Sequence, residues 1–149
     1  MATVTHKVIY VAIIGQQNEP IVTRVFDGTD EAELELSAYA AMDVIQEKMV
    51  IQQYSNNSKS VSEPYLGFIT PTLVGEEFYK VHAYAAATGF KIIAIFNEVD
   101  APISGIKQLF ERIHKLFSTT ICNPLMPMKF NSPNFDKALN KIAEEFSTW

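Results

Sequence analysis

Residues 78–96 read FYKVHAYAAATGFKIIAIF, and this stretch decides the fold. It holds two runs, 78–84 and 90–96, that are rich in the β-branched and aromatic residues favoured in strands, with a short turn between them. A third run of this kind, 65–70, precedes them across the short connection 71–75. Connections of this length join antiparallel neighbours, so the sequence predicts an antiparallel meander of three strands.

Two further strands and three helices complete the order. Residues 7–14 and 21–26 are apolar runs joined by a polar turn, which predicts a hairpin. The helix that follows is expected to start after Asp30, with an apolar stripe at three- and four-residue steps: Leu34, Ala38, Ala41, Ile45 and Met49. Two helices follow the meander, the second starting at Pro133. The order ββαβββαα predicts an α+β fold in one domain spanning residues 1–149.

The side of the first helix opposite this stripe is less polar than a solvent-facing side should be. Projected as an α-helix, that side carries Leu36, Tyr39, Ala40, Asp43, Glu47 and Val50. Asp43 stands out because aspartate is a poor helix former in mid-helix. One interpretation is an ordinary exposed charge. The other is a partner interface, in which a polar anchor lies inside an apolar patch.

The composition limits the classes of function. The chain has 149 residues, with 12 basic and 17 acidic side chains and a net charge of −5. This balance argues against a nucleic-acid-binding protein, which carries a clustered basic face. The single cysteine, Cys122, cannot form an internal disulfide, and no apolar run approaches the roughly 20 residues of a membrane span. Without a recognisable leader, the sequence predicts a cytoplasmic protein.

No motif indicates catalysis. The six glycines are not spaced to form a phosphate-binding loop, and the three histidines and one cysteine lack the spacing of zinc ligands. Cys122 and His114 could be imagined as a thiol–imidazole pair, but their positions do not require the two side chains to meet. The sequence therefore nominates no catalytic residue, no metal site and no cofactor.

Four short segments occur in a recognisable order: AMDVIQEK at 41–48, YLGFITPT at 65–72, ICNPL at 121–125 and FD at 135–136. Together they resemble the sedlin family of small subunits of the TRAPP vesicle-tethering complex, and most closely its subunit 2-like branch. The resemblance covers almost the whole chain. It departs from the family pattern at Gln46, where a second aspartate is common, and at Leu125, where an aromatic residue is common.

The resemblance implies a longin-like (profilin-like) fold: a five-stranded antiparallel sheet with one helix on one face and two on the other. It also implies a non-catalytic adaptor subunit of an assembly that acts as a nucleotide-exchange factor for a Rab-type GTPase in ER-to-Golgi and Golgi traffic. The implied partners are the other TRAPP subunits, and through them the GTPase and the membrane surface. The family's first-helix aspartate, on a face implicated in assembly, falls on Asp43. The implied role of Cys122, Asn123 and Pro124 is structural.

Two other classes of function stay open. A longin domain of another trafficking class, such as a clathrin-adaptor small chain or the regulatory domain of a fusion protein, would share this element order. A fusion protein would need a heptad helix and usually a membrane anchor beyond Trp149. A small enzyme would need a pocket with converging polar groups, for which the sequence offers no candidate.

Overall fold

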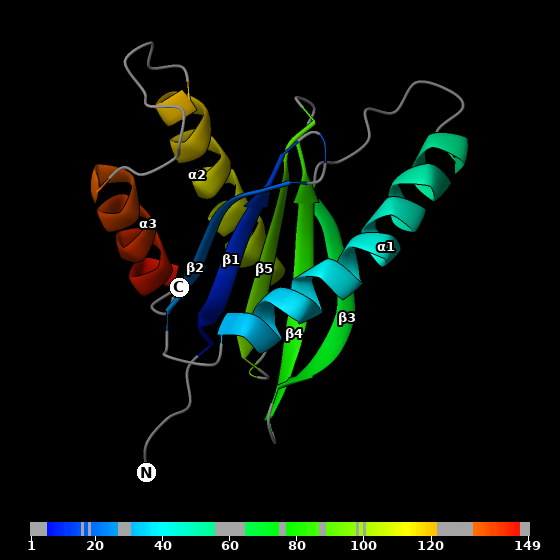
Figure 1. The fold of residues 1–149 in the computed structure, drawn as a ribbon, viewed down its shortest axis with the longest axis horizontal. Coiled ribbons are helices and arrows are strands. Elements are labelled where there is room, and N and C mark those ends of the chain that lie inside the picture. Colours follow the sequence, from blue (N-terminus) through cyan, green and yellow to red (C-terminus); the bar gives the residue numbers. More distant parts are fainter. Residues whose placement is uncertain are drawn as a thin grey trace.

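The computed structural model describes residues 6–15, 17, 19–26, 31–55, 65–74, 77–86, 89–97, 99, 101–121 and 133–146. These residues form five strands and three helices (Figure 1). In chain order the elements are β1 (Val8–Ile14), β2 (Pro20–Val25), α1 (Glu31–Ser55), β3 (Tyr65–Val74), β4 (Glu77–Ala85), β5 (Lys91–Asn97), α2 (Ile103–Ile121) and α3 (Pro133–Phe146). The predicted order ββαβββαα is confirmed.

The sheet is one antiparallel layer with the strand order β2-β1-β5-β4-β3. The predicted hairpin and meander are both present, and they are joined by pairing of β1 with β5, in which Val11 lies opposite Ala94. β1 is buried along its whole length, and β5 is buried except at its last residue. These two central strands are covered on both faces, which explains why their sequences are apolar throughout rather than alternating.

Helices cover the two faces of the sheet unequally. Figure 1 shows α1 crossing one face near β4 and β3, with α2 and α3 against the other face. Two separate apolar clusters match these two layers, one containing the α1 stripe and the other containing the buried sides of α2 and α3. One helix on one face and two on the other is the arrangement of the longin-like fold, so that prediction is confirmed.

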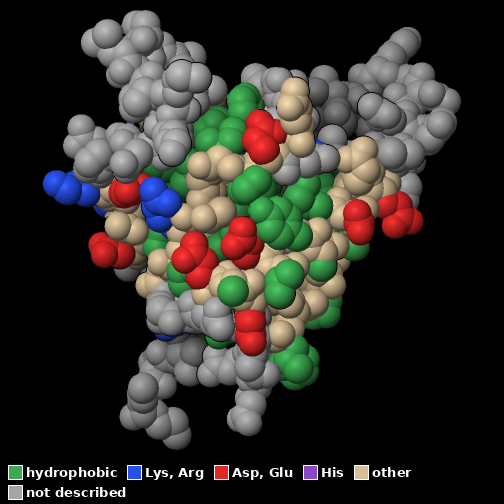
Figure 2. Space-filling model, viewed as in Figure 1, with side chains coloured by type: hydrophobic (Ala, Val, Ile, Leu, Met, Phe, Trp, Pro, Cys, Tyr) green, Lys and Arg blue, Asp and Glu red, His purple; other side chains and the backbone are tan. Residues whose placement is uncertain are grey.

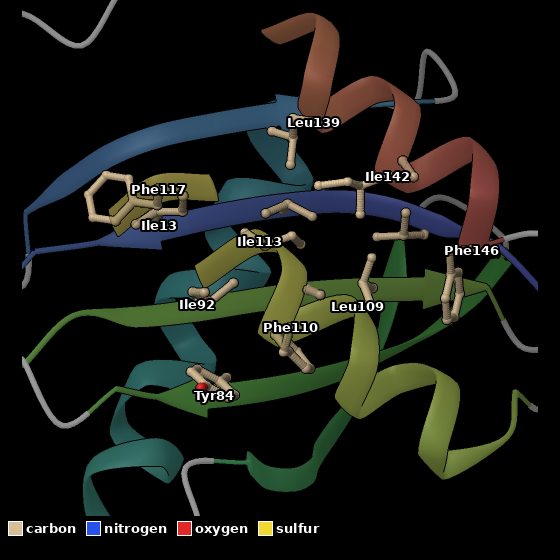
Figure 3. Packing of buried hydrophobic residues seen from close by; sticks show 14 of the residues in the cluster. Ile13, Tyr84, Ile92, Leu109, Phe110, Ile113, Phe117, Leu139, Ile142 and Phe146 are labelled. Atoms are coloured by element: carbon tan, nitrogen blue, oxygen red, sulfur yellow. The ribbon is translucent and has the colours of Figure 1, made fainter. Parts of the chain in front are cut away.

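The cluster under α2 and α3 combines aliphatic side chains with aromatic rings (Figure 3). Phe110 on α2 is fully buried, stacks on Tyr84 of β4 at 5.7 Å between ring centroids, and meets Phe96 of β5 edge-on at 6.5 Å. From α3 come the four residues that its helical spacing selects, all buried: Phe135, Leu139, Ile142 and Phe146. Burial of side chains of this size is worth about 2 kcal/mol each, so this layer holds α2 and α3 on the sheet.

Two ion pairs fasten α3 to its neighbours. Arg24 of β2 donates from Nε to an Asp136 carboxylate oxygen at 2.9 Å, and from a terminal guanidinium nitrogen to the same oxygen at 2.5 Å. Arg112 of α2 pairs with Glu145 at 2.6 Å. The adjacent residues Phe135 and Asp136 therefore have different roles. Phe135 packs in the core, whereas Asp136 forms an ion pair with Arg24 of the edge strand β2.

The end of β3 differs from the sequence prediction. Residues 71–75 were expected to form a turn, but β3 continues through Pro71 to Val74 and pairs with β4 over that length. Proline is tolerated here because β3 is an edge strand, where a missing N–H need not break a ladder. Two register shifts interrupt the pairing, and Gly67 lies beside the first with φ of 88°, a conformation that favours glycine.

Candidate functional site

The inner side of α1 fixes which residues face outward. Leu34, Ala38, Ala41 and Ile45 are all buried against the sheet, whereas the side chain of Met49 lies outside the described residues. Two polar contacts also tie the helix to β3. The hydroxyls of Ser37 and Thr72 lie 2.7 Å apart, and Lys48 Nζ donates to the Phe68 carbonyl oxygen at 2.8 Å. The helix is therefore held at both apolar and polar points, and its opposite side is fixed toward the exterior.

The outer face of α1, defined here as Leu36, Tyr39, Ala40, Asp43 and Glu47, is exposed at every one of these positions. Leu36 is 69% exposed and Tyr39 38% exposed. The sixth residue predicted for this face, Val50, lies in α1, but its side chain is outside the described residues. Figure 2 shows hydrophobic and acidic side chains intermingled over the surface around α1, while conspicuous basic side chains gather near α3.

The electrostatic environment of this face is acidic. Tyr39 donates a hydrogen bond from its hydroxyl to a Glu35 carboxylate oxygen at 3.3 Å. Local desolvation and the Glu35 charge raise the pKa of Tyr39 above its usual value. Beneath the helix, burial first and then the Glu35 and Glu31 charges raise the pKa of Tyr10. A partner that covers this face must supply donors or positive charge as well as apolar contact area.

The outer face of α1 offers both apolar and polar contacts to a binding partner. The outer face presents carboxylates and apolar side chains on a rigid helix, without a nucleophile placed beside a base. No group of three or more His, Cys, Asp or Glu residues with metal-binding geometry occurs within the described part of the chain. The same part contains no helix with the length and apolar character needed to cross a membrane.

His82 of β4 is one of the three histidines of the sequence. His82 is buried, with Nδ1 2.9 Å from the Tyr65 hydroxyl and the Phe96 ring at 5.1 Å. Burial, followed by the charges of Lys80 and Lys48, lowers the pKa of His82 to about 4, so the ring is neutral at cellular pH. It is a core histidine that contacts its neighbours.

The pair of Cys122 and His114 considered from the sequence lies partly outside the described residues. His114 lies on α2 with Nε2 3.5 Å from the Ser118 hydroxyl, one turn further along the helix. Cys122, Asn123 and Pro124 lie outside the described residues, as does the proposed helix cap at Asp30. α2 is described as far as Ile121, directly before this motif.

One feature of the surface was missed from the sequence. A groove of ≈ 320 Å³ opens on the side of the sheet opposite α1, and its lining includes Phe68, His82 and Ile103. The exposed side chains of Leu73 and Phe78 belong to the same end of β3 and β4. The apolar character of these two residues was the signal that the sequence offered for this surface. Because a turn was predicted at 71–75, Leu73 was not assigned to a strand.

Comparison with known proteins gives two matches that agree. The sedlin family model matches residues 13–145. A curated protein of Dictyostelium discoideum, named trafficking protein particle complex subunit 2-like protein, is 33% identical over 144 aligned positions, and the match covers 93% of each chain. The range matched by the family model contains every element from β2 to α2 and all but the last residue of α3, and therefore includes the outer face of α1.

Proposed function

The chain belongs to the sedlin family, and from this premise we propose that it is a non-catalytic subunit of a TRAPP-type vesicle-tethering complex. The observation that carries the proposal is the outer face of α1, where exposed apolar side chains lie beside Asp43 on a helix fixed to the sheet. The similar Dictyostelium protein, named as subunit 2-like in a trafficking protein particle complex, supports the same assignment.

In this proposal the outer face of α1 is the surface that joins the complex. Leu36 and Tyr39 supply the apolar contact, and Asp43 and Glu47 accept hydrogen bonds or ion pairs from the neighbouring subunit. Because the helix is held by its buried stripe and by Lys48 and Ser37, binding requires little rearrangement. The sequence also assigns Val50 to this face.

The complex supplies the activity, and this chain supplies assembly. We propose that the assembly acts as a nucleotide-exchange factor for a Rab-type GTPase in ER-to-Golgi and Golgi traffic, with its exchange centre in other subunits. The chain then reaches membranes only peripherally, through the cytoplasmic complex. The segment Cys122-Asn123-Pro124, directly after α2 in the sequence, is proposed to have a structural role.

The test is affinity purification of the tagged chain and of its Asp43→Tyr variant, followed by identification of the bound proteins. The proposal expects TRAPP subunits with the unaltered chain and their loss with the variant, whose melting temperature stays unchanged because Asp43 is exposed. Glu144→Tyr, at an exposed acidic position on α3, is the matched control and retains the subunits.

Two outcomes contradict the proposal in different ways. Retention of all subunits by Asp43→Tyr would show that the outer face of α1 is not the assembly surface. Recovery of large clathrin-adaptor chains in place of TRAPP subunits would favour a longin domain of another trafficking class.

A further inference from the structure

The face of the sheet that carries α2 and α3 is not covered to its corner. On β4 alternate residues point to this side, where Tyr84 stacks on Phe110 and His82 contacts Phe96. Tyr84 and His82 are each 8% exposed, whereas Phe78, further along the same side of β4, is 55% exposed. The cover that α2 provides therefore ends between His82 and Phe78.

The neighbouring strand continues this exposed area. In the register of β3 with β4, Phe68 lies opposite His82 and Leu73 opposite Phe78. Ile103, the first residue of α2, lines the groove together with Phe68 and Lys80. We define the corner patch by its exposed apolar side chains and this lysine: Phe68, Leu73, Phe78, Ile103 and Lys80.

The patch is large enough for a protein partner. Taking about 200 Å² for a fully exposed side chain of this size, its four apolar side chains leave roughly 400 Å² in water. That is about half of the roughly 800 Å² that each partner buries in an interface of standard size. Apolar surface concentrated in this way beside a groove is typical of the buried core of an interface.

The edge of β3 is poorly suited to pairing with an added strand. Lys48 already donates to the Phe68 carbonyl oxygen, and Pro71 has no N–H to offer. A register shift beside Gly67 bends the same strand. Docking therefore uses the side chains of the patch rather than the backbone of the edge strand.

We propose that the corner patch binds a segment of a second protein that carries a bulky apolar side chain beside aspartate or glutamate. Basic groups select the charge of the occupant, because Lys80 lines the groove and Lys107 Nζ lies 5.7 Å from the ring centre of nearby Tyr65. A two-fold pair of copies would place the same patch of both chains in one interface, so that their basic groups would repel each other. The patch therefore fits a different protein, and it leaves α1 free on the other side of the sheet.

The experiment places the photo-crosslinking amino acid p-benzoylphenylalanine at position 78, 103 or 119 of the full chain in cells. Positions 78 and 103 are exposed in the patch, and Thr119 is an exposed control on α2. After irradiation, mass spectrometry identifies the crosslinked segment. The proposal expects crosslinks from 78 and 103 to one segment of another protein, with an apolar residue and a carboxylate adjacent, and only background from 119.

Charge reversal tests the selection of the occupant. Lys80→Glu is expected to lower the crosslinking yield at position 78 about tenfold, whereas Lys115→Glu, at an exposed site on α2, leaves it unchanged. Because Lys80 is half-buried, the melting temperature of its variant is measured as well, and Phe68→Ser serves as a second variant with a loss of similar size.

Three results overturn the inference. They are a yield at 78 and 103 no higher than at 119, crosslinks to a second copy of this chain, and a yield that neither Lys80→Glu nor Phe68→Ser reduces. The same amino acid at position 36, on the outer face of α1, reports separately on the proposed assembly surface. Failure at one surface is thereby distinguished from failure at the other.

Discussion

The buried imidazole of His82 predicts how the stability of this protein depends on pH. Burial and two nearby lysines lower its pKa to about 4 in the folded chain, against an ordinary value of 6.5. In the unfolded chain His82 therefore binds a proton near pH 6.5, whereas in the folded chain it binds one only near pH 4. The contribution of neutral His82 to the free energy of unfolding is fully present above pH 6.5 and falls as the pH decreases toward 4.

The size of the effect follows from the separation of the two pKa values. Between pH 7.5 and pH 4.5, protonation of this one side chain in the unfolded state lowers the free energy of unfolding by about 2 kcal/mol. Urea denaturation at a series of pH values measures it, as a decrease of about 1 M in the urea midpoint for a typical dependence on denaturant.

Other groups titrate in the same range, so the comparison is with a His82→Asn variant. Asparagine keeps an acceptor near the position of Nδ1, facing the Tyr65 hydroxyl, but cannot be protonated. Between pH 7.5 and pH 4.5 the free energy of unfolding of the unaltered protein should decrease by about 2 kcal/mol more than that of the variant. Parallel curves for the two proteins would refute the inference that His82 is held neutral by its surroundings.

Three further predictions concern stability and share one assay, urea denaturation. Arg24→Ala and Asp136→Ala each lower the free energy of unfolding by about 1 kcal/mol, and the double variant loses no more than one of them, because both remove the same partly exposed pair; additive losses would contradict this. Phe110→Ala, in the buried cluster under α2 and α3, lowers the free energy of unfolding by about 4 kcal/mol, whereas Phe78→Ala, in the corner patch, lowers it by less than about 1 kcal/mol. Equal losses would contradict the assignment of Phe110 to the core and of Phe78 to the surface. Gly67→Ala costs about 1 kcal/mol through backbone conformation alone, since an added methyl meets open space, and an unchanged midpoint would contradict that.

Local periodicity was sufficient to predict most elements of the fold. The helical spacing of Leu34, Ala38, Ala41 and Ile45 identified the buried side of α1, and the same logic placed Phe135 in the core. The pairing of β1 with β5 was not predictable in this way, because it joins strands far apart in the sequence and both are apolar on every residue. The family resemblance implied one five-stranded sheet, but it did not specify which strands join the hairpin to the meander.

The two candidate surfaces also differ in how far local sequence patterns predict them. The exposure of the outer face of α1 followed from projecting one helix, and the structure confirms that exposure at Leu36, Tyr39 and Asp43. The corner patch depends instead on where α2 stops covering the sheet, which is a property of tertiary packing. Leu73 was also assigned to a turn, because Pro71 is an ordinary turn residue and nothing local marks β3 as an edge strand.

We propose that this chain works as a bound subunit through the outer face of α1. The most direct test of this proposal is sedimentation velocity of the fluorescently labelled chain in cell extract, comparing the unaltered protein with Asp43→Tyr. The unaltered chain is expected to sediment with a large assembly, and the variant is expected to sediment as a folded species near 16.7 kDa. An unaltered chain that already sediments alone at that mass would contradict the proposal.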